Sequence, residues 1–203
     1  MEQLGIANAP LVGHSMGGTV SLSVAIKYPQ RVSKVVVVGS PIVGSSLAFP
    51  LKWAGYRPIA FMLFNMMGVF RSAIRLASPI ICRDARFADM MDRDLSRTTV
   101  ESFLLSIASL RRTDLRPMLG QINVPAMGMY GDCDVIVHPR QWEPMKKGIS
   151  HAYIERFSSA GHFPMLEEPQ NFSERLKSFL NRDEPPLSTQ PSASLSPTPS
   201  VTL

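Results

Sequence analysis

The sequence predicts an α/β fold in which a parallel sheet of about four strands is flanked by helices and interrupted by a helical insertion. A short apolar run at residues 10–12 is followed by a glycine-rich turn and by a helix-forming segment, residues 19–28, that Pro29 ends. Residues 34–39 form an uninterrupted valine-rich run, which is typical of a parallel strand buried on both faces. A helix between two such strands implies a right-handed β-α-β unit.

The turn between the first strand and the first helix has the sequence Gly-His-Ser-Met-Gly-Gly and runs from Gly13 to Gly18. A sharp strand-to-helix turn is the structural context that a G-x-S-x-G nucleophile elbow requires. We expect Ser15 to occupy its tip in a strained backbone conformation that costs on the order of 1 to 3 kcal/mol. Gly13 and Gly17 are expected to support the elbow by giving the tip the room it needs.

Residues 44–119 have a helical pattern and predict an all-helical insertion between two strands. One helix is expected at residues 58–70, because Pro58 suits a first helical turn and apolar residues follow it. A second helix is expected at residues 98–110, where Thr98 and Glu101 have the spacing of a capping box.

The chain after the insertion predicts two more strands and two more helices. In order, these are a strand at 125–131, a helix at 140–147, a strand at 152–157 and a helix at 169–182 with one apolar face. The proline- and serine-rich tail cannot bury enough surface to offset its ordering entropy, so we expect it to be disordered. The chain therefore divides into a first core segment at 1–43, the insertion at 44–119, a second core segment at 120–182 and the tail at 183–203.

The composition is ordinary for a globular protein of one domain. Residues 44–83 contain five basic residues and no acidic one, which accounts for the whole net charge of +5. No alternation of aromatic and basic residues accompanies this charge, so nucleic acid is not an expected partner. Two cysteines make no disulfide framework, and the N-terminus lacks the pattern of a signal peptide, so we expect a cytoplasmic protein.

A serine hydroxyl needs a base within hydrogen-bond reach to act as a nucleophile at neutral pH, and a carboxylate in turn holds that base. His162 lies in a loop after the last predicted strand, at the sheet edge where parallel sheets place their chemistry. A structural or surface role is expected for the other three histidines, which are His14, His138 and His151. The carboxylate should come from the loop after residues 125–131, where Asp132 and Asp134 compete.

Three motifs give the chain a resemblance to the α/β-hydrolases. The first is the elbow around Ser15. Residues 131–137, Gly-Asp-Cys-Asp-Val-Ile-Val, are similar to the family's G-x-x-D-x-x-V turn, and residues 161–169 are similar to its histidine loop. The motifs also stand in the family's order of serine, acid and histidine. This resemblance implies an α/β-hydrolase fold.

The resemblance implies a role for each matching residue. It favours Asp134 over Asp132 as the acid. Ser15 would attack an acyl carbon, His162 would take and later deliver its proton, and Asp134 would hold the imidazole tautomer. The backbone N–H of Met16 would contribute to the oxyanion hole. Neither a cofactor nor a metal is implied.

The family's early strands and its second oxyanion donor come well before the elbow, and this chain has twelve residues before Gly13. We therefore expect an N-terminally truncated α/β-hydrolase whose elbow strand has an open edge beside Leu11. A wrongly assigned start codon, a separate polypeptide and a decaying, inactive remnant are the three explanations that the sequence leaves open.

The function that the resemblance implies is a serine hydrolase that cleaves an ester, with an apolar acyl group in its small-molecule substrate. The insertion resembles the family's cap, and its apolar residues either line a pocket or form the core of the cap: Phe61, Met62, Leu63, Phe64, Met66 and Met67. A thioester or a carbon–carbon bond is an alternative target, and a truncated, non-catalytic remnant is an alternative of another kind. Basic and apolar residues coincide at 47–81, so contact with a membrane surface or lipid is a further expectation.

Overall fold

Four parallel strands form the sheet of the computed structural model, which describes residues 1–47 and 67–182. The strands pair in the order β1-β2-β3-β4, so each lies beside the next one along the chain. Their bounds are Ala9–His14 for β1, Val32–Val38 for β2, Ala126–Gly131 for β3 and Tyr153–Phe157 for β4. The predicted fold class and strand order are confirmed.

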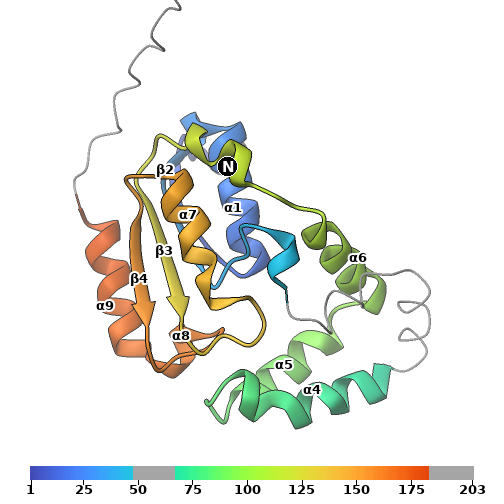
Figure 1. The fold of residues 1–203 in the computed structure, drawn as a ribbon. Helices are drawn as coiled ribbons and strands as arrows, with labels where there is room; N and C mark the ends of the chain where they lie inside the picture. The colour runs from blue at the N-terminus through green and yellow to red at the C-terminus, as the bar shows by residue number, and fades with distance from the viewer. Residues whose placement is uncertain (48–66, 183–203) are drawn as a thin grey trace, which may run out of the picture.

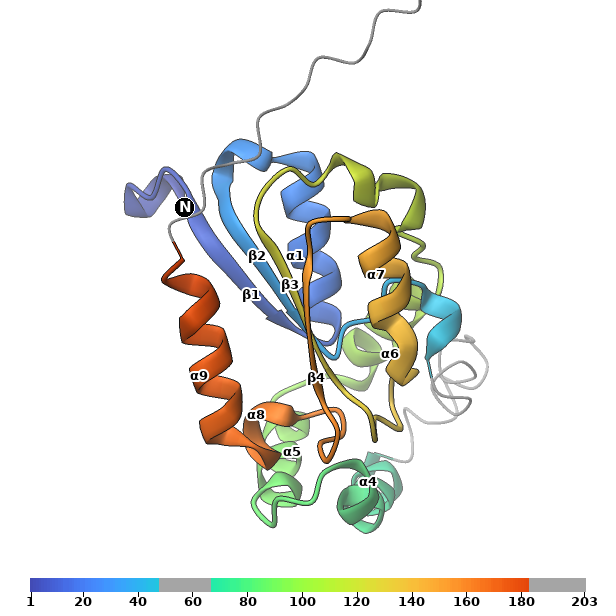
Figure 2. The ribbon, with the colours of Figure 1, turned by 60° about the vertical axis from the view of Figure 1, so that its left-hand side comes forward.

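Helices cover both faces of this sheet (Figures 1 and 2). Helices α1, Met16–Lys27, and α7, Trp142–Gly148, lie on one face, and α9, Pro169–Leu180, lies on the other. Because α1 connects β1 to β2 and α7 connects β3 to β4, each helix is the crossover of a parallel β-α-β unit. A short helix, α8, Pro164–Glu167, precedes α9.

The valines of β2 divide the core into two parts, because successive side chains of a strand point to opposite faces. Val35 and Val37 are fully buried in the core on the side of α1 and α7. Val36 and Val38 are buried in the core on the side of α9, where they join the phenylalanines of that helix. Burial on both faces explains why this strand is an apolar run without alternation.

Three described helices lie between β2 and β3 (Figure 1). These are α4, Met67–Ile81, α5, Phe87–Ser96, and α6, Val100–Arg111, with 3-10 turns at Gly44–Ser46 and Arg116–Gln121. The helix expected at 58–70 falls mostly outside the described residues. Its last four residues begin α4, which continues well beyond the expected end, and α5 was not expected at all.

The capping box predicted for α6 is wrong. Thr99 is the N-cap, and its hydroxyl accepts a hydrogen bond from the Ser102 N–H at 3.1 Å. Thr98 instead donates its hydroxyl to the carbonyl of Asp94, in the last turn of α5, at 3.0 Å. Two adjacent threonines can each cap a helix end, and the preceding helix decides which one is free to do so.

The two ends of the insertion meet at the core. Val43 forms an isolated antiparallel bridge with Asp114. On either side of this bridge, the Gly44 N–H donates to Thr113 at 2.8 Å and the Leu115 N–H donates to Ile42 at 3.0 Å. The chain therefore leaves the core after β2 and returns to it at the same place.

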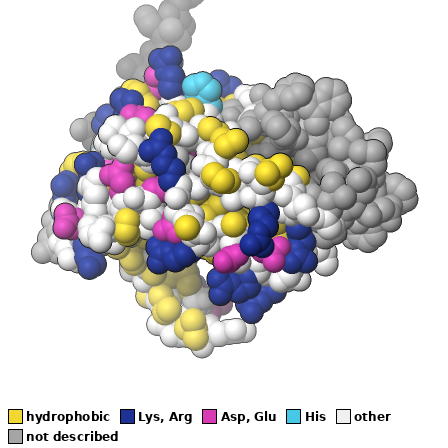
Figure 3. Space-filling model, turned by 90° about the horizontal axis from the view of Figure 1, so that it is seen from below, with side chains coloured by type: hydrophobic (Ala, Val, Ile, Leu, Met, Phe, Trp, Pro, Cys, Tyr) yellow, Lys and Arg dark blue, Asp and Glu magenta, His cyan; other side chains and the backbone are white. Residues whose placement is uncertain are grey.

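Strands β1 and β4 lie at the two edges of the sheet. Within the described residues β1 pairs only with β2, as the predicted open edge requires, and Val12 is 47% exposed there. The underside of the molecule, on which α4 and α5 lie in Figure 1, mixes hydrophobic with Lys and Arg side chains (Figure 3). No helix in the described ranges is both long and apolar enough to cross a membrane. The tail at 183–203 lies outside these ranges.

Candidate active site

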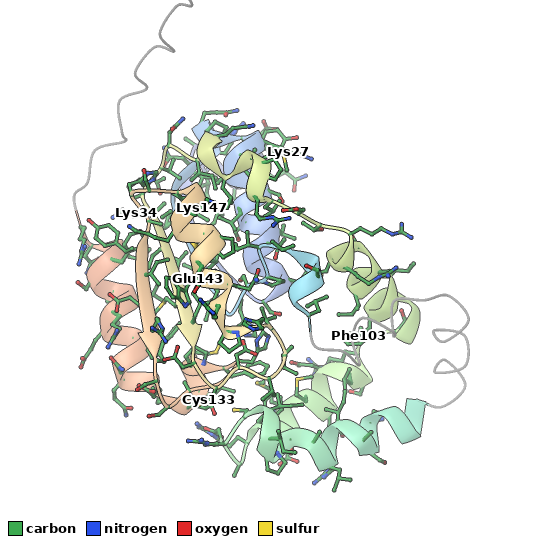
Figure 4. The ribbon with its side chains drawn as sticks, viewed as in Figure 1. Lys27, Lys34, Phe103, Cys133, Glu143 and Lys147 are labelled. Carbon is green, nitrogen blue, oxygen red and sulfur yellow. The ribbon has the colours of Figure 1, made fainter. Side chains whose placement is uncertain are left out.

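The candidate site lies at the edge of the sheet where the carboxyl ends of the strands meet. Ser15 follows β1, Gly39 follows β2, Asp134 lies in the loop after β3, and His162 lies in the loop after β4. This edge can be located in Figure 4 by Cys133, which lies below the arrowheads of the strands and is the neighbour of Asp134 in the sequence. Parallel pairing thus gathers residues that are far apart in the sequence.

Ser15 has the strained backbone that the elbow motif predicts. Its φ of 53° and ψ of −123° make it the only residue other than glycine with a positive φ in the part of the chain that the structure describes. The Ser15 N–H donates to the carbonyl of Val38, at the end of β2, at 2.8 Å. A conformation of this kind costs about 1 to 3 kcal/mol, and the surrounding contacts must hold it in place.

Of the two glycines expected to give the elbow its room, Gly13 does so and Gly17 does not. A Cβ at Gly13 would lie 2.4 Å from the backbone of Gly17, and a Cβ at Gly18 would lie 2.0 Å from the Ser40 hydroxyl. A Cβ at Gly17 would meet nothing within 4 Å. The turn therefore needs glycine at Gly13 and Gly18, because a side chain at either position would clash. At Gly17 there is space for a side chain, so the turn does not need glycine there for steric reasons.

Met16 is the first residue of α1, directly after Ser15. The first amides of a helix have no partner within the helix, and the helix dipole gives this end a partial positive charge. The Met16 N–H therefore belongs to the group of donors that favours an anion beside Ser15.

Asp134 and His162 form a buried pair. The carboxylate oxygen Oδ2 of Asp134 accepts a hydrogen bond from Nδ1 of His162 at 2.7 Å, and the two residues are 7% and 3% exposed. The other oxygen, Oδ1, accepts from the backbone N–H groups of Ile136 and Val137 at 2.8 and 2.9 Å. Because Nδ1 carries the hydrogen that the carboxylate accepts, Nε2 is the ring nitrogen left to act as a base.

Asp132 is engaged elsewhere. Both its oxygens accept hydrogen bonds from the guanidinium of Arg156, at 2.9 Å each. The same guanidinium lies 5.5 Å from the ring centre of Trp142. Of the two acids that the sequence leaves open, the structure joins Asp134 to His162 and joins Asp132 to a surface arginine of β4.

Gly39 leaves room for the ring of His162, a role that sequence reasoning missed. Its φ is 54°, and a Cβ there would lie 3.2 Å from both Nδ1 and the carbonyl oxygen of His162. Since Ser15 donates to the residue just before Gly39, the serine backbone and the His162 ring are held against the same strand end. A glycine directly after a buried valine run was the signal available for this contact.

His14 holds the backbone of the His162 loop. Its Nε2 lies 2.8 Å from the carbonyl oxygen of His162, and its ring centre lies 4.8 Å from the rings of His162 and Phe163. Burial first, and the nearby charge of His162 second, lower the pKa of His14 to about 4. The ring is therefore neutral near pH 7, and Nε2 donates its hydrogen to the carbonyl. The expected structural role of His14 thus acts directly on the candidate base.

The other two histidines have other hydrogen-bond partners. His138 is the N-cap of a 3-10 turn, and its Nδ1 accepts a hydrogen bond from the Arg140 N–H at 3.2 Å. Nε2 of His151 lies 3.0 Å from the Val124 carbonyl. Among the described residues no group of three or more His, Cys, Asp or Glu side chains is arranged to hold a metal ion.

A groove of about 300 Å³ lies between α1 and α6 and includes Met16 at the elbow. Its walls combine apolar side chains such as Val20 and Leu110 with hydroxyls such as Ser109. The groove therefore provides a partly apolar surface beside the residue that follows Ser15.

Comparisons with known proteins find hydrolases. The hydrolase family described as Serine aminopeptidase, S33, matches residues 2–169. A 2-hydroxy-6-oxononadienedioate/2-hydroxy-6-oxononatrienedioate hydrolase from a Pseudomonas species is 32% identical over 192 residues, which are 90% of this chain and 66% of the relative. A pimeloyl-acyl-carrier-protein methyl ester esterase from Vibrio atlanticus is 28% identical over 84% of this chain and 70% of its own length.

The fold is also similar to that of solved structures. An esterase from Exiguobacterium antarcticum matches with a TM-score of 0.73 and 23% identity, over 89% of this chain and 69% of the esterase. This likeness shows a shared fold. The chain spans 64 to 66% of the length of three of its oxononadienedioate hydrolase relatives, just under two thirds.

His14 generates a prediction about stability and pH. Its folded pKa of about 4 lies below the ordinary value of 6.5, so the unfolded chain binds the proton more tightly. This contribution is therefore complete above pH 6.5 and is lost as the pH falls towards 4. Urea unfolding should show wild-type stability decreasing between pH 7 and pH 4.5 by about 2 kcal/mol more than that of His14→Asn, which cannot titrate. Equal slopes in the two proteins would contradict the assignment of a partly buried, neutral His14.

Proposed function

We propose that Ser15, His162 and Asp134 form a catalytic triad. The premise is that the chain belongs to the Serine aminopeptidase, S33, family of α/β-hydrolases. The observation that carries the proposal is the buried 2.7 Å hydrogen bond from His162 to Asp134, at the sheet edge where Ser15 occupies a strained turn. A general base held by a carboxylate is what a serine nucleophile requires. The function proposed is that of a serine hydrolase acting on an ester with an apolar acyl group.

In the first half of the reaction, Ser15 Oγ attacks the acyl carbon and His162 Nε2 takes the hydroxyl proton. The negative charge that forms on the carbonyl oxygen is stabilised by the Met16 N–H at the start of α1. Collapse of this intermediate breaks the bond to the alcohol, which leaves with the proton from Nε2. The acyl group is then esterified to Ser15.

In the second half, a water molecule attacks the acyl carbon, and His162 Nε2 takes a proton from that water. The same proton returns to Ser15 Oγ when the carboxylic acid leaves, so the enzyme is restored. Asp134 keeps the Nδ1 hydrogen on its own side of the ring and stabilises the imidazolium in both halves. Its second oxygen is already held by two backbone amides, which fixes the direction of the carboxylate.

The groove between α1 and α6 supports an apolar group in the substrate. It includes Met16, whose N–H would bind the oxyanion, so an acyl group or an alcohol group could extend from Ser15 along it. The methionines and phenylalanines expected to line a pocket at 61–66 lie outside the described residues, and the side chain of Met67 is not described either. That part of the substrate proposal stays a prediction.

A carbon–carbon bond is the second candidate for the bond that is cleaved. The relative that is 32% identical bears the name of a 2-hydroxy-6-oxo dienedioate hydrolase. A compound of that description has a ketone and two carboxylates but no ester, so hydrolysis would separate the ketone carbon from a neighbouring carbon. Addition of an oxygen nucleophile to a ketone uses the same base and oxyanion donor as addition to an ester. A non-catalytic remnant of the family is the alternative in which neither bond is cleaved.

Ser15 provides the first test of catalysis. We expect a fluorophosphonate probe to label the wild-type chain at Ser15, and Ser15→Ala to lose hydrolysis of a short p-nitrophenyl ester by about 10³-fold or more. Circular dichroism should be the same for both proteins, because the side chain is small and lies at a turn. A folded wild-type chain that neither reacts with the probe nor hydrolyses the ester would favour the remnant. Turnover of a 6-oxo dienoate without turnover of esters would favour carbon–carbon cleavage.

The two neighbouring acids provide a matched pair of variants. Asp134→Asn should lower kcat/KM by about 10² to 10⁴-fold, because the amide no longer holds the His162 tautomer. Asp132→Asn weakens an exposed ion pair with Arg156, which contributes about 0 to 1 kcal/mol, and should leave kcat/KM within a few-fold of wild type. Initial rates on one ester substrate measure both effects. Losses of similar size in the two variants would count against the assignment of Asp134.

Contact with a lipid surface is a separate proposal, and α4 is its most specific support. The structure pairs Arg71 with Asp92 at 2.8 Å and Arg75 with Asp89 at 3.6 Å, so acids of α5 offset the positive charge of this stretch. Leu76 and Ile80 are 84% and 73% exposed. They lie one turn apart on the same side of α4. Burial of these apolar side chains in the lipid, more than the charge of the arginines, would therefore drive the contact.

Vesicle sedimentation tests this proposal. We expect the chain to bind vesicles, anionic ones included, at low and at high salt, because burying each of the two apolar side chains contributes about 1.5 to 3 kcal/mol. Leu76→Gln with Ile80→Gln should weaken binding at least tenfold. Leu105→Gln, at an exposed leucine of α6, is the matched control and should bind like wild type. Wild-type protein that stays in the supernatant with anionic vesicles would refute a lipid contact.

A further inference from the structure

One carboxylate joins the histidine loop to the helical insertion. Glu167, the last residue of α8, accepts a hydrogen bond at Oε2 from the Gly161 N–H at 2.7 Å. Its other oxygen, Oε1, accepts from the Arg83 N–H at 3.1 Å. Gly161 immediately precedes His162, and Arg83 follows the end of α4. A single side chain therefore bridges the loop of the candidate base and a segment 78 residues away in the sequence.

A ring contact joins the same two segments on the other side of His162. Phe87, at the start of α5, is 1% exposed, and its ring centre lies 4.7 Å from that of Phe163. The ring of Phe163 in turn lies 5.1 Å from that of His162 and 4.8 Å from that of His14. The residues on either side of His162 are thus both linked to residues 83–87: Gly161 is linked to Arg83 through Glu167, and Phe163 contacts Phe87 directly.

The chemistry of Glu167 suits this bridging position. A carboxylate accepts at both oxygens, and hydrogen bonds from backbone amides to a charged acceptor are about twice as strong as neutral ones. A glutamine of the same size has one oxygen and one NH₂ group, so it can serve only one of the two amides. The other amide, of Gly161 or of Arg83, would then face a donor. Glu167→Gln is therefore a selective probe of the bridge that preserves the volume of the side chain.

We propose that Glu167 is a positioning residue that fixes the orientation of His162 and links it to the segment that joins α4 to α5. The inference rests on the proposed role of His162 as the base. Because the amide of Gly161 and the ring of Phe163 flank that histidine, a displacement of residues 82–87 changes the direction of its imidazole. Coupling of this kind is reciprocal, so the state of the histidine also influences how the insertion is held.

The test compares Glu167→Gln with Glu168→Gln. Glu168 is the adjacent acid, and its carboxylate accepts from the side chain of Asn171, in the first turn of α9, at 2.7 Å. In Glu167→Gln we expect kcat for the ester to fall about 5- to 100-fold with KM within about twofold, since a small misplacement of a reacting group lowers the rate more than it lowers binding. Glu168→Gln should keep the wild-type kcat. A Glu167 that only stabilises the fold would lower the melting temperature and leave kcat unchanged, which would overturn the proposal.

A double variant tests the link to the insertion. If Glu167 and Phe87 act through one connection, Glu167→Gln combined with Phe87→Leu should lower kcat by less than the product of the two separate factors. Multiplication of the two factors would mean that the carboxylate and the ring act independently, and it would overturn the proposed coupling.

A measurement that does not need activity separates this proposal from the proposed function. The proton on His162 Nδ1, which Asp134 accepts, should give a low-field NMR signal in the wild-type protein. We expect this signal to shift or exchange faster in Glu167→Gln and to stay in place in Glu168→Gln. Failure of Ser15 to react with a fluorophosphonate, with the signal still sensitive to Glu167→Gln, would reject the catalytic role and keep the positioning role. An unchanged signal in Glu167→Gln would reject the positioning role, whatever the activity.

Discussion

Parallel pairing of four adjacent strands is the constraint on which the rest of this structure depends. It directs every strand to end at the same edge, so that the loops after β1, β2, β3 and β4 meet there. Burial of β2 on both faces holds the sheet between α1 and α7 on one side and α9 on the other. With the strands fixed, the strained turn at Ser15 and the left-handed Gly39 are held by neighbours that cannot move away.

Much of this arrangement could be predicted from the sequence, because its signals are local. The glycine-rich turn, the valine run and the loops at residues 131–137 and 161–169 each identify a strand end without reference to the rest of the chain. The family motif already favours Asp134 over Asp132, and the structure supplies a physical reason for that choice. The register pairs Tyr130 with Arg156, so the chain that continues beyond β3 brings Asp132 to that arginine, while Asp134 reaches His162.

The contacts that the sequence did not reveal are those between distant segments. Three examples are the hydrogen bond from His14 to the His162 carbonyl, the room that Gly39 leaves for the His162 ring, and the bridge made by Glu167. In each case the local sequence around one residue does not indicate its partner. The insertion was harder for a related reason. Helices α4 and α5 pack on each other more than on the sheet. The choice of Thr99 over Thr98 as the cap of α6 depends on where the previous helix ends.

The closed junction at the base of the insertion bears on how such a protein can diversify. Since Val43 and Asp114 lie side by side and the flanking amides tie the two chain segments together, the sheet has the same anchor points whatever the length of chain between them. Changes in that interval alter what reaches the site without altering the strand register. The triad candidates and the insertion can thus change independently during evolution. Glu167 and Phe87 are exceptions, because each takes part in a contact between the histidine loop and the insertion.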